Sequence, residues 1–351
     1  MSTHTHGGNV YQYAGCTDFS ANCNPLGTPE SVIQEGIRSL QRVYEYPQVG
    51  YQPLRDAIAA YEQVKSSQVI CGNGAAELIF SLCHAIKPKQ ALVLAPTFAE
   101  YQQALESEGC EIQYYTLKEE NSFSVKEDFL EALTPELDLV FLCNPNNPTG
   151  MLTEKAFLHR ILQRCKEHHI FLVIDECFQD FIEQPLSYTM KTELEEQENL
   201  FLLKAFTKRY AMAGIRLGYG LSSNQNLLGR MEQCVQPWNI STIAQACGLA
   251  ALNEQEYVEK SRQLIFKERA FLKEEMKQLG LKVYDSQANY LFFQGPEELF
   301  EQCLEKKILI RDCSNYEGLK KGYYRIAVKL HADNEKLIRA LQEILTDPET
   351  E

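Results

Sequence analysis

Two ionisable residues in this sequence each follow a run of apolar residues. Asp175 comes directly after Phe-Leu-Val-Ile at 171–174, and Lys208 follows the apolar run at 200–206. A carboxylate that closes a buried strand is costly unless it pairs with a cation or caps a helix. A lysine amine that the protein shields from water can act as a nucleophile toward carbonyl groups. The two residues therefore predict that Lys208 reacts with a carbonyl group and that the Asp175 carboxylate pairs with a cationic group.

Three further segments supply groups that could hold a ligand. The turn Gly-Asn-Gly-Ala-Ala-Glu at 72–77 separates a strand-like run from a helix-like run, and the N–H groups of such a turn attract anions. The loop Asn-Pro-Asn-Asn-Pro-Thr-Gly at 144–150 holds two prolines and a glycine, which should present Asn147 rigidly. Arg216, eight residues after Lys208, adds a cation.

Together these groups form the set that pyridoxal phosphate requires. The lysine forms a Schiff base with this cofactor, and the aspartate keeps the pyridine nitrogen protonated so that the ring can accept electrons. The amide can bond the ring hydroxyl, while the glycine-rich turn and the arginine can hold the phosphate. Each group is a weak signal alone, but the full set in this order is specific. We therefore expect pyridoxal 5′-phosphate as the cofactor and no metal ion.

The elements around these groups predict an α/β fold. Strand-like apolar runs at 69–71, 91–95, 138–143, 170–175, 200–206 and 216–221 alternate with helix-like segments such as 75–86, 98–107 and 154–168. Nearly continuous apolar strands separated by helices are typical of a mostly parallel sheet in a three-layer α/β/α arrangement. Ligands bind beyond the carboxyl ends of such strands, which is where the polar segments lie.

The rest of the chain predicts an N-terminal arm and a second domain. At ~150 residues per domain, 351 residues correspond to roughly two domains. We expect an arm over 1–40 that packs on both domains, a large domain over 41–237 and a smaller α+β domain over 238–351. A long helix from about 241 would join the two. Further expected elements of the small domain are strands at 289–294, 308–311 and 323–328 and helices at 296–306 and 334–345.

Composition excludes several classes of partner. The formal net charge of -14 repels polyanions, so we expect neither nucleic acid nor a membrane surface as a partner. The 12 cysteines are scattered without C-x-x-C spacing, which indicates small buried apolar residues in a reducing compartment. No secretion signal pattern and no apolar stretch of ~20 residues is evident. We therefore expect a cytoplasmic protein.

Over essentially its whole length, the sequence resembles fold-type I pyridoxal-phosphate enzymes of the class I/II aminotransferase family. The resemblance implies that Lys208 is the Schiff-base lysine, that Asp175 binds the pyridine nitrogen and that Asn147 binds the ring hydroxyl. The other cofactor-binding residues that it implies are Phe98, which stacks on the ring, and the phosphate ligands Gly74, Ala75, Ala76, Thr207, Arg216 and Tyr46.

The same resemblance implies a homodimer with shared active sites, because Tyr46 matches the tyrosine that reaches the phosphate in the neighbouring subunit. Arg325 matches the arginine that grips the substrate carboxylate by a two-pronged contact. Many relatives carry Ser or Thr where this chain has Ala205, which leaves Thr207 to contact the phosphate.

Within the family, two groups compete: threonine-phosphate decarboxylases of cobalamin biosynthesis and histidinol-phosphate aminotransferases. The strings at 6–9, 18–27, 98–101, 236–239 and 310–316 resemble the decarboxylases. Phe178 stands where many aminotransferases carry a tyrosine that bonds the ring oxygen. The resemblance implies that a phosphorylated amino acid is bound by His6, Asn22, Asn147, Arg311 and Arg325.

The expected reaction is decarboxylation of O-phospho-L-threonine to aminopropanol phosphate. A histidinol-phosphate aminotransferase or a related aminotransferase is the alternative, since the bond to Cα that lies perpendicular to the cofactor ring decides which reaction occurs. A third alternative is a non-catalytic protein of this fold, against which the intact Lys208, Asp175 and Arg216 argue.

Overall fold

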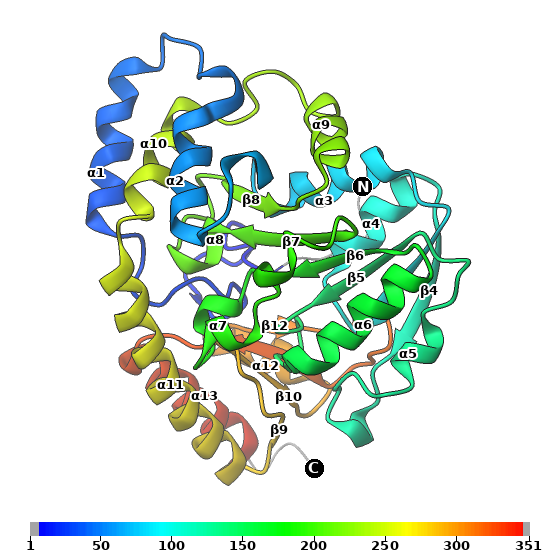
Figure 1. Ribbon diagram of the computed structural model, residues 1–351. Coiled ribbons are helices and arrows are strands. Elements are labelled where there is room, and N and C mark those ends of the chain that lie inside the picture. The colour runs from blue at the N-terminus through cyan, green and yellow to red at the C-terminus, as the bar shows by residue number, and fades with distance from the viewer. Residues whose placement is uncertain (1–6, 347–351) are drawn as a thin grey trace.

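The computed structural model of the chain describes residues 7–346, and helices and strands alternate through most of it (Figure 1). The strands are β1 (Thr17–Asp18), β2 (Val69–Gly72), β3 (Gln90–Ala95), β4 (Glu111–Thr116), β5 (Leu139–Cys143), β6 (Phe171–Asp175), β7 (Leu200–Ala205), β8 (Gly218–Leu221), β9 (Lys282–Val283), β10 (Tyr290–Gln294), β11 (Ile308–Leu309), β12 (Arg311–Asp312) and β13 (Tyr323–Ala327).

The helices are α1 (Glu30–Ser39), α2 (Gln52–Glu62), α3 (Ala75–Ile86), α4 (Ala99–Ser107), α5 (Phe129–Ala132), α6 (Lys155–Glu167), α7 (Pro185–Tyr188), α8 (Phe206–Arg209), α9 (Gln225–Gln233), α10 (Thr242–Ala251), α11 (Gln255–Gln278), α12 (Leu299–Glu305) and α13 (His331–Thr346). Short 3₁₀ turns are η1 (Leu40–Arg42), η2 (Val49–Tyr51), η3 (Ser66–Gln68), η4 (Glu119–Asn121), η5 (Gln179–Phe181) and η6 (Lys191–Glu193).

The larger sheet is mostly parallel, as predicted. Within residues 7–346 it has seven strands in the order β2-β8-β7-β6-β5-β3-β4. Strands β3 to β7 are parallel to their neighbours in this set, and β8 runs antiparallel to both β7 and β2. Its central strands are buried on both faces, which explains their nearly continuous apolar sequences.

Helices cover both faces of this sheet, so the three-layer prediction is confirmed. One core lies between the sheet and helices α3, α4 and α9, and includes Leu78, Leu105 and Met231. The opposite core lies under α2, α6 and α10, and includes Ile58 and Ile161. Figure 1 shows α3 and α6 on opposite sides of the strands.

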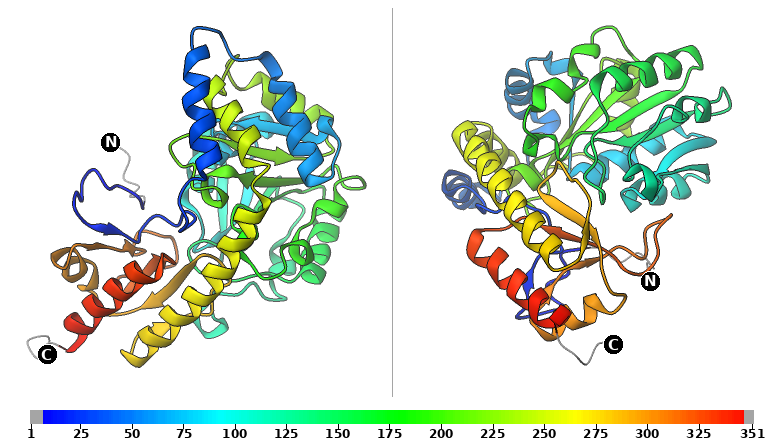
Figure 2. Two further views of the ribbon diagram at one scale, coloured as in Figure 1. Left: turned by 90° about the vertical axis from the view of Figure 1, so that its left-hand side faces the viewer. Right: turned by 90° about the horizontal axis from the view of Figure 1, so that it is seen from below.

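A smaller antiparallel sheet, in the order β12-β13-β10-β9, forms the C-terminal part of the chain. Helices α11, α12 and α13 pack on it around a separate core that includes Leu272, Leu291 and Leu341. The N-terminal segment reaches this part, because β1 pairs in parallel with β11. Figure 2 shows this blue segment beside the C-terminal strands, and α1 beside α10. The predicted α+β character of this part is confirmed.

Three elements differ from the sequence-based expectations. The helical region expected from about 241 is two helices, α10 and α11, and residues 252–254 separate them. The strand expected at 308–311 is divided between β11, which pairs with β1, and β12, which pairs with β13. Strand β4 was missed because it is a half-exposed edge strand without an apolar run. None of the helices described over 7–346 is long and apolar enough to cross a bilayer.

Candidate active site

The predicted cofactor residues lie at one edge of the larger sheet. The carboxyl ends of β2, β3, β5, β6 and β7 meet at this edge, and β8, which runs the opposite way, begins there. The segments at these strand ends contain Gly74, Ala75, Ala76, Phe98, Asn147, Asp175, Thr207, Lys208 and Arg216. The topology therefore brings together residues that are up to 142 positions apart, from Gly74 to Arg216.

Asp175 ends β6 as a buried carboxylate with two donors. The Tyr101 hydroxyl donates to its Oδ2 at 2.5 Å, and the Cys177 N–H donates to its Oδ1 at 2.8 Å. Burial raises the pKa of Asp175, although these hydrogen bonds and the charge of Lys208 lower it in part. A cationic group placed against this carboxylate would offset the cost of its burial. The site thus fits a protonated pyridine nitrogen.

Lys208 lies in the short turn α8, which follows β7. Its side chain is half-buried, and its Nζ lies 6.0 Å from the centre of the Phe178 ring. The N-terminal segment holds this turn in place: the Asn24 N–H donates to the Lys208 carbonyl oxygen at 3.0 Å, and Asn24 Nδ2 donates to the Arg209 carbonyl oxygen at 2.8 Å. The neighbouring Thr207 is also half-buried.

Gly74 and Arg216 approach each other closely at the start of α3. Gly74 has a φ of +86°, and a Cβ there would lie 2.5 Å from Nη2 of Arg216. Gly218 packs against the same turn, since its Cβ would lie 2.5 Å from the Ala75 nitrogen. The first N–H groups of a helix lack partners within the helix. The guanidinium and the amides of 74–76 therefore form a cradle suited to a phosphate.

Asn147 stands in a loop that other segments brace. Thr97 Oγ1 donates to Asn146 Oδ1 at 2.8 Å, and the Tyr290 hydroxyl donates to the Asn146 carbonyl oxygen at 2.8 Å. Asn147 is buried, and its Oδ1 accepts a hydrogen bond from Nη1 of Arg325. The amide is thus held beside the predicted substrate arginine.

Two arginines lie directly opposite each other on adjacent strands. Arg311 of β12 and Arg325 of β13 are register partners, and both are almost completely buried, with 6% and 5% exposure. Arg325 Nη2 donates to the Ser20 carbonyl oxygen at 2.7 Å, and Arg311 Nη2 donates to Asn315 Oδ1 at 2.8 Å. Like charges placed opposite each other on strands repel. An anionic ligand between them would remove this cost.

The remaining predicted residues are placed differently. Asn22 is buried, and its Nδ2 has no hydrogen-bond partner among residues 7–346. Its carbonyl oxygen accepts from Asn289 Nδ2 at 2.9 Å, at the junction of the N-terminal segment with the C-terminal sheet. Tyr46 is 79% exposed and stacks on Trp238, with ring centres 4.6 Å apart, rather than joining the cluster. His6 lies outside the described residues.

Two residues of this site, Tyr101 and Glu100, have no role predicted from the sequence. Tyr101 bonds Asp175 and stacks on Phe141 with ring centres 4.8 Å apart. Glu100 lies in the first turn of α4, and burial raises its pKa to about 7 although the charges of Lys208 and Arg311 lower it. For Tyr101 the sequence did offer a signal, namely its spacing from Phe98. The two residues lie three positions apart at the start of α4, and their ring centres are 5.6 Å apart.

The donor set therefore fits the predicted cofactor. The cradle of 74–76 with Arg216 suits a phosphate, the buried Asp175 suits a ring cation, and Lys208 offers an amine between them along the sheet edge. Phe178 leaves the position of the expected tyrosine hydroxyl apolar, and its buried ring contacts Tyr290 edge to face.

Comparison with known proteins covers nearly the whole chain. The aminotransferase class I and II family matches residues 14–344. Threonine-phosphate decarboxylase from Salmonella typhimurium is 39% identical over 97% of this chain and 96% of that protein. Histidinol-phosphate aminotransferase from Methanosphaera stadtmanae is 30% identical over 93% of this chain and 90% of that protein. The crystal structure of the histidinol-phosphate aminotransferase from Clostridium acetobutylicum superposes with a TM-score of 0.87 at 30% identity, over 93% of this chain and 98% of that one.

Proposed function

The chain belongs to the class I and II aminotransferase family, whose members use pyridoxal 5′-phosphate, and on this premise we propose that it decarboxylates O-phospho-L-threonine to aminopropanol phosphate with this cofactor. Lys208 would bind the cofactor covalently and Asp175 would bind its ring nitrogen. The other residues that would hold it are Asn147 at the ring hydroxyl, Phe98 against the ring, and Gly74, Ala75, Ala76, Thr207, Arg216 and the partner subunit's copy of Tyr46 at the phosphate.

The observation that carries this proposal is the buried pair of Arg311 and Arg325. Two adjacent buried guanidinium groups match a substrate with two anionic groups, and phosphothreonine has a carboxylate and a phosphate. The amide of Asn147 lies beside one of them. Asn22 and His6 would add further contacts to the substrate.

The reaction needs one property of the cofactor and three tasks from this chain's residues. When bound, the cofactor supplies a ring that accepts the electron pair of the Cα–carboxylate bond. Arg311 and Arg325 hold the two anionic groups and so orient that bond. Asp175 retains a proton at the ring nitrogen. The Lys208 amine delivers a proton to Cα after carbon dioxide has left, which balances the reaction.

Transamination of histidinol phosphate is the second candidate. The structural likeness to a histidinol-phosphate aminotransferase, at a TM-score of 0.87, favours it. Histidinol phosphate has a phosphate but no carboxylate, so the arginine pair would then serve the two carboxylates of 2-oxoglutarate. Phe178 and the 39% identity to a threonine-phosphate decarboxylase favour the first candidate.

We further propose that the protein is cytoplasmic and that its large domain begins at residue 41 and its small domain at residue 238. We also propose that it forms a homodimer with shared active sites. Exposed apolar side chains are concentrated between positions 33 and 49, namely Ile33, Ile37, Leu40, Val43, Tyr44, Tyr46 and Val49. A second copy of the chain would cover this surface and bring Tyr46 to its neighbour's cofactor phosphate. We propose no nucleic-acid or membrane partner.

Paired turnover assays test the proposed function. The holoenzyme is incubated with phosphothreonine and no keto acid, and separately with histidinol phosphate and 2-oxoglutarate. Release of carbon dioxide in the first reaction, with no glutamate in the second, is the expected result. Glutamate formation without carbon dioxide release would instead assign the chain to the aminotransferases.

A further inference from the structure

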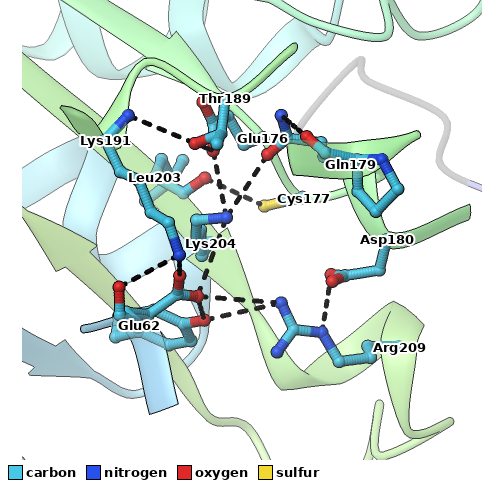
Figure 3. Close-up of polar contacts among 12 residues, drawn as sticks. Glu62, Glu176, Cys177, Gln179, Asp180, Thr189, Lys191, Leu203, Lys204 and Arg209 are labelled. Atoms are coloured by element: carbon cyan, nitrogen blue, oxygen red, sulfur yellow. Dashed lines mark hydrogen bonds and ion pairs between the residues drawn. The ribbon is translucent and has the colours of Figure 1, made fainter. Parts of the chain in front are cut away.

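A cluster of buried charges adjoins Asp175 and Lys208, the two residues proposed to bind the ring nitrogen and the carbonyl carbon of the cofactor. Its members are Glu62 of α2, Glu176 just after β6, Lys191 of η6, Lys204 of β7, Arg209 of α8 and Asp180 of η5 (Figure 3). Glu62, Glu176, Lys204 and Arg209 are each at most 6% exposed at the side chain. Buried ions are expensive, so such a cluster needs a reason.

The charges form one continuous chain of contacts. Lys204 Nζ lies 3.0 Å from Glu176 Oε2 and 3.7 Å from Glu62 Oε1. Arg209 Nη2 lies 4.0 Å from the same Glu62 oxygen, and Arg209 Nε donates to Asp180 Oδ2 at 2.6 Å. We call the sequence of contacts Glu176–Lys204–Glu62–Arg209 the ionic chain.

Neutral groups fix the two carboxylates of the ionic chain. The Tyr219 hydroxyl donates to Glu62 Oε1 at 2.5 Å. Thr189 Oγ1 donates to Glu176 Oε2 at 2.9 Å, and the Met190 N–H donates to Glu176 Oε1 at 3.0 Å. The ionic chain is therefore tied to surrounding backbone as well as to itself.

The two ends of the ionic chain adjoin the two residues of the cofactor site. Glu176 follows Asp175, and Arg209 follows Lys208. Asp175 is the register partner of Leu203, and successive residues of a strand point to opposite faces. Lys204 therefore lies on the face away from Asp175. In the turn α8, consecutive side chains diverge by about 100°, which lets Lys208 face the site while Arg209 faces the ionic chain.

The charges of Glu62 and Lys204 in the ionic chain are fixed rather than switchable. Burial alone would raise the pKa of Glu62, but Lys204, Arg209 and the Tyr219 hydrogen bond lower it to about 2. Burial alone would lower the pKa of Lys204, but Glu62 and Glu176 raise it above its ordinary value. These groups stay ionised throughout the range in which an enzyme works.

Stability alone is a poor explanation for the ionic chain. Well-packed apolar residues in place of a buried ion pair are often as stable or more stable. Nη1 of Arg209 is buried without a hydrogen-bond partner within 7–346, so the arrangement is not optimised for stability. Ion pairs and hydrogen bonds differ from apolar contacts in being directional, which suits them to fixing positions.

We propose that Lys204 and Arg209 are positioning residues, and that the ionic chain sets the separation between the Asp175 carboxylate and the Lys208 amine. Misplacing a reacting group by about 1 Å can cost about a hundredfold in rate. For the proposed decarboxylation, the placement of the amine decides whether the proton goes to Cα. When the proton goes instead to the cofactor carbon that holds the amino nitrogen, one water molecule releases the decarboxylated product as an aldehyde, and the amino group stays on the cofactor.

The test uses a charge-neutral double replacement in the holoenzyme, Lys204→Met with Glu176→Gln. It removes one charge of each sign, and Lys204 lines a cavity of about 520 Å³ into which the new side chain can relax. The matched control is Glu268→Gln, a buried carboxylate that His331 Nδ1 and Asn334 Nδ2 contact at 3.0 Å between α11 and α13. Arg209→Lys, which keeps the charge but loses the planar fork, serves if the double replacement does not fold.

The first readout is the pH titration of the bound cofactor's absorbance without substrate. We expect the midpoint to move by about half a pH unit or more in the double replacement, by less in Arg209→Lys, and not at all in Glu268→Gln. The second readout rests on the proposed function: the amount of aldehyde formed per carbon dioxide released should rise about tenfold or more. Folded variants with an unchanged midpoint would overturn the positioning role. If the unsubstituted enzyme releases no carbon dioxide, the proposed function fails, and the absorbance titration still decides the positioning role.

Discussion

Replacement of Tyr101 by phenylalanine should weaken catalysis through Asp175. The Tyr101 hydroxyl donates to Asp175 Oδ2 at 2.5 Å, while its ring is buried and stacks on Phe141 at an interplanar angle of 7°. Phenylalanine keeps this stack and removes one donor. A hydrogen bond to a charged group contributes about 1.5–3 kcal/mol, which corresponds to about 1–2 pKa units. We therefore expect the pKa of Asp175, which burial already raises, to rise further.

The sign of the effect follows from the ionised form. Asp175 must be ionised to hold a proton at the ring nitrogen, so activity is lost as the pH falls through its pKa. Tyr101→Phe should move this acidic limb to higher pH by about 1–2 units, which lowers kcat about 10- to 100-fold at pH values on the limb. The assay is kcat as a function of pH.

Tyr290→Phe is the matched control for this prediction. Its hydroxyl is equally buried but donates to a neutral acceptor, the Asn146 carbonyl oxygen, at 2.8 Å. We expect it to keep the position of the acidic limb. If Tyr101→Phe retained full kcat and the same pH profile, the assignment of Asp175 as the ring-nitrogen partner would be refuted.

Three further replacements test separate parts of the structure. Burial raises the pKa of Glu100 to about 7, so the stability of the fold should fall as the pH rises from about 4.5 to 7. Glu100→Gln should therefore raise the free energy of unfolding by up to ~3 kcal/mol at pH 8 and leave it unchanged at pH 4. Unfolding in urea at the two pH values measures this difference. Hydrogen bonds from Lys282, Tyr284 and Tyr323 lower the pKa of Glu119 to about 2. Its contribution is lost as the pH falls below about 4.5, so Glu119→Gln should remove that dependence, with a loss of under ~1 kcal/mol at pH 7 because the side chain is 36% exposed. Gly74→Ala should weaken cofactor binding about tenfold or more in a titration, since its φ is +86° and its Cβ would meet Arg216.

Much of the fold could be predicted because its strands are buried on both faces. The apolar runs located β2, β3, β5, β6, β7 and β8, and the helix predicted at 75–86 is α3 with the same bounds. The polar groups that follow these runs lie at a common edge because parallel strands end together. This geometry explains why Asp175 and Lys208 could be linked from the sequence.

Contacts between distant segments could not be predicted. The register that places Arg311 opposite Arg325 depends on the division of 308–311 between two sheets, which no local pattern shows. Lys204 is a charged residue inside an apolar run, and the sequence does not show what pairs with it. Its partner Glu62 lies 142 positions earlier in the chain. Ionic partners this far apart leave no periodic signal.

The net charge of -14 and an anionic substrate are compatible because the cations are gathered locally. Arg311 and Arg325 are buried together, and Arg216 stands at the glycine turn. The molecule as a whole therefore carries a negative net charge, while the substrate-binding part of the site carries a positive charge.

Borohydride reduction of the purified holoenzyme, followed by mass spectrometry of its peptides, tests the central claim most directly. The account predicts a reduced pyridoxyl group attached to Lys208, and its loss in Lys208→Ala. Attachment to another lysine, or an unchanged yield in Lys208→Ala, would contradict the site described at the end of β7.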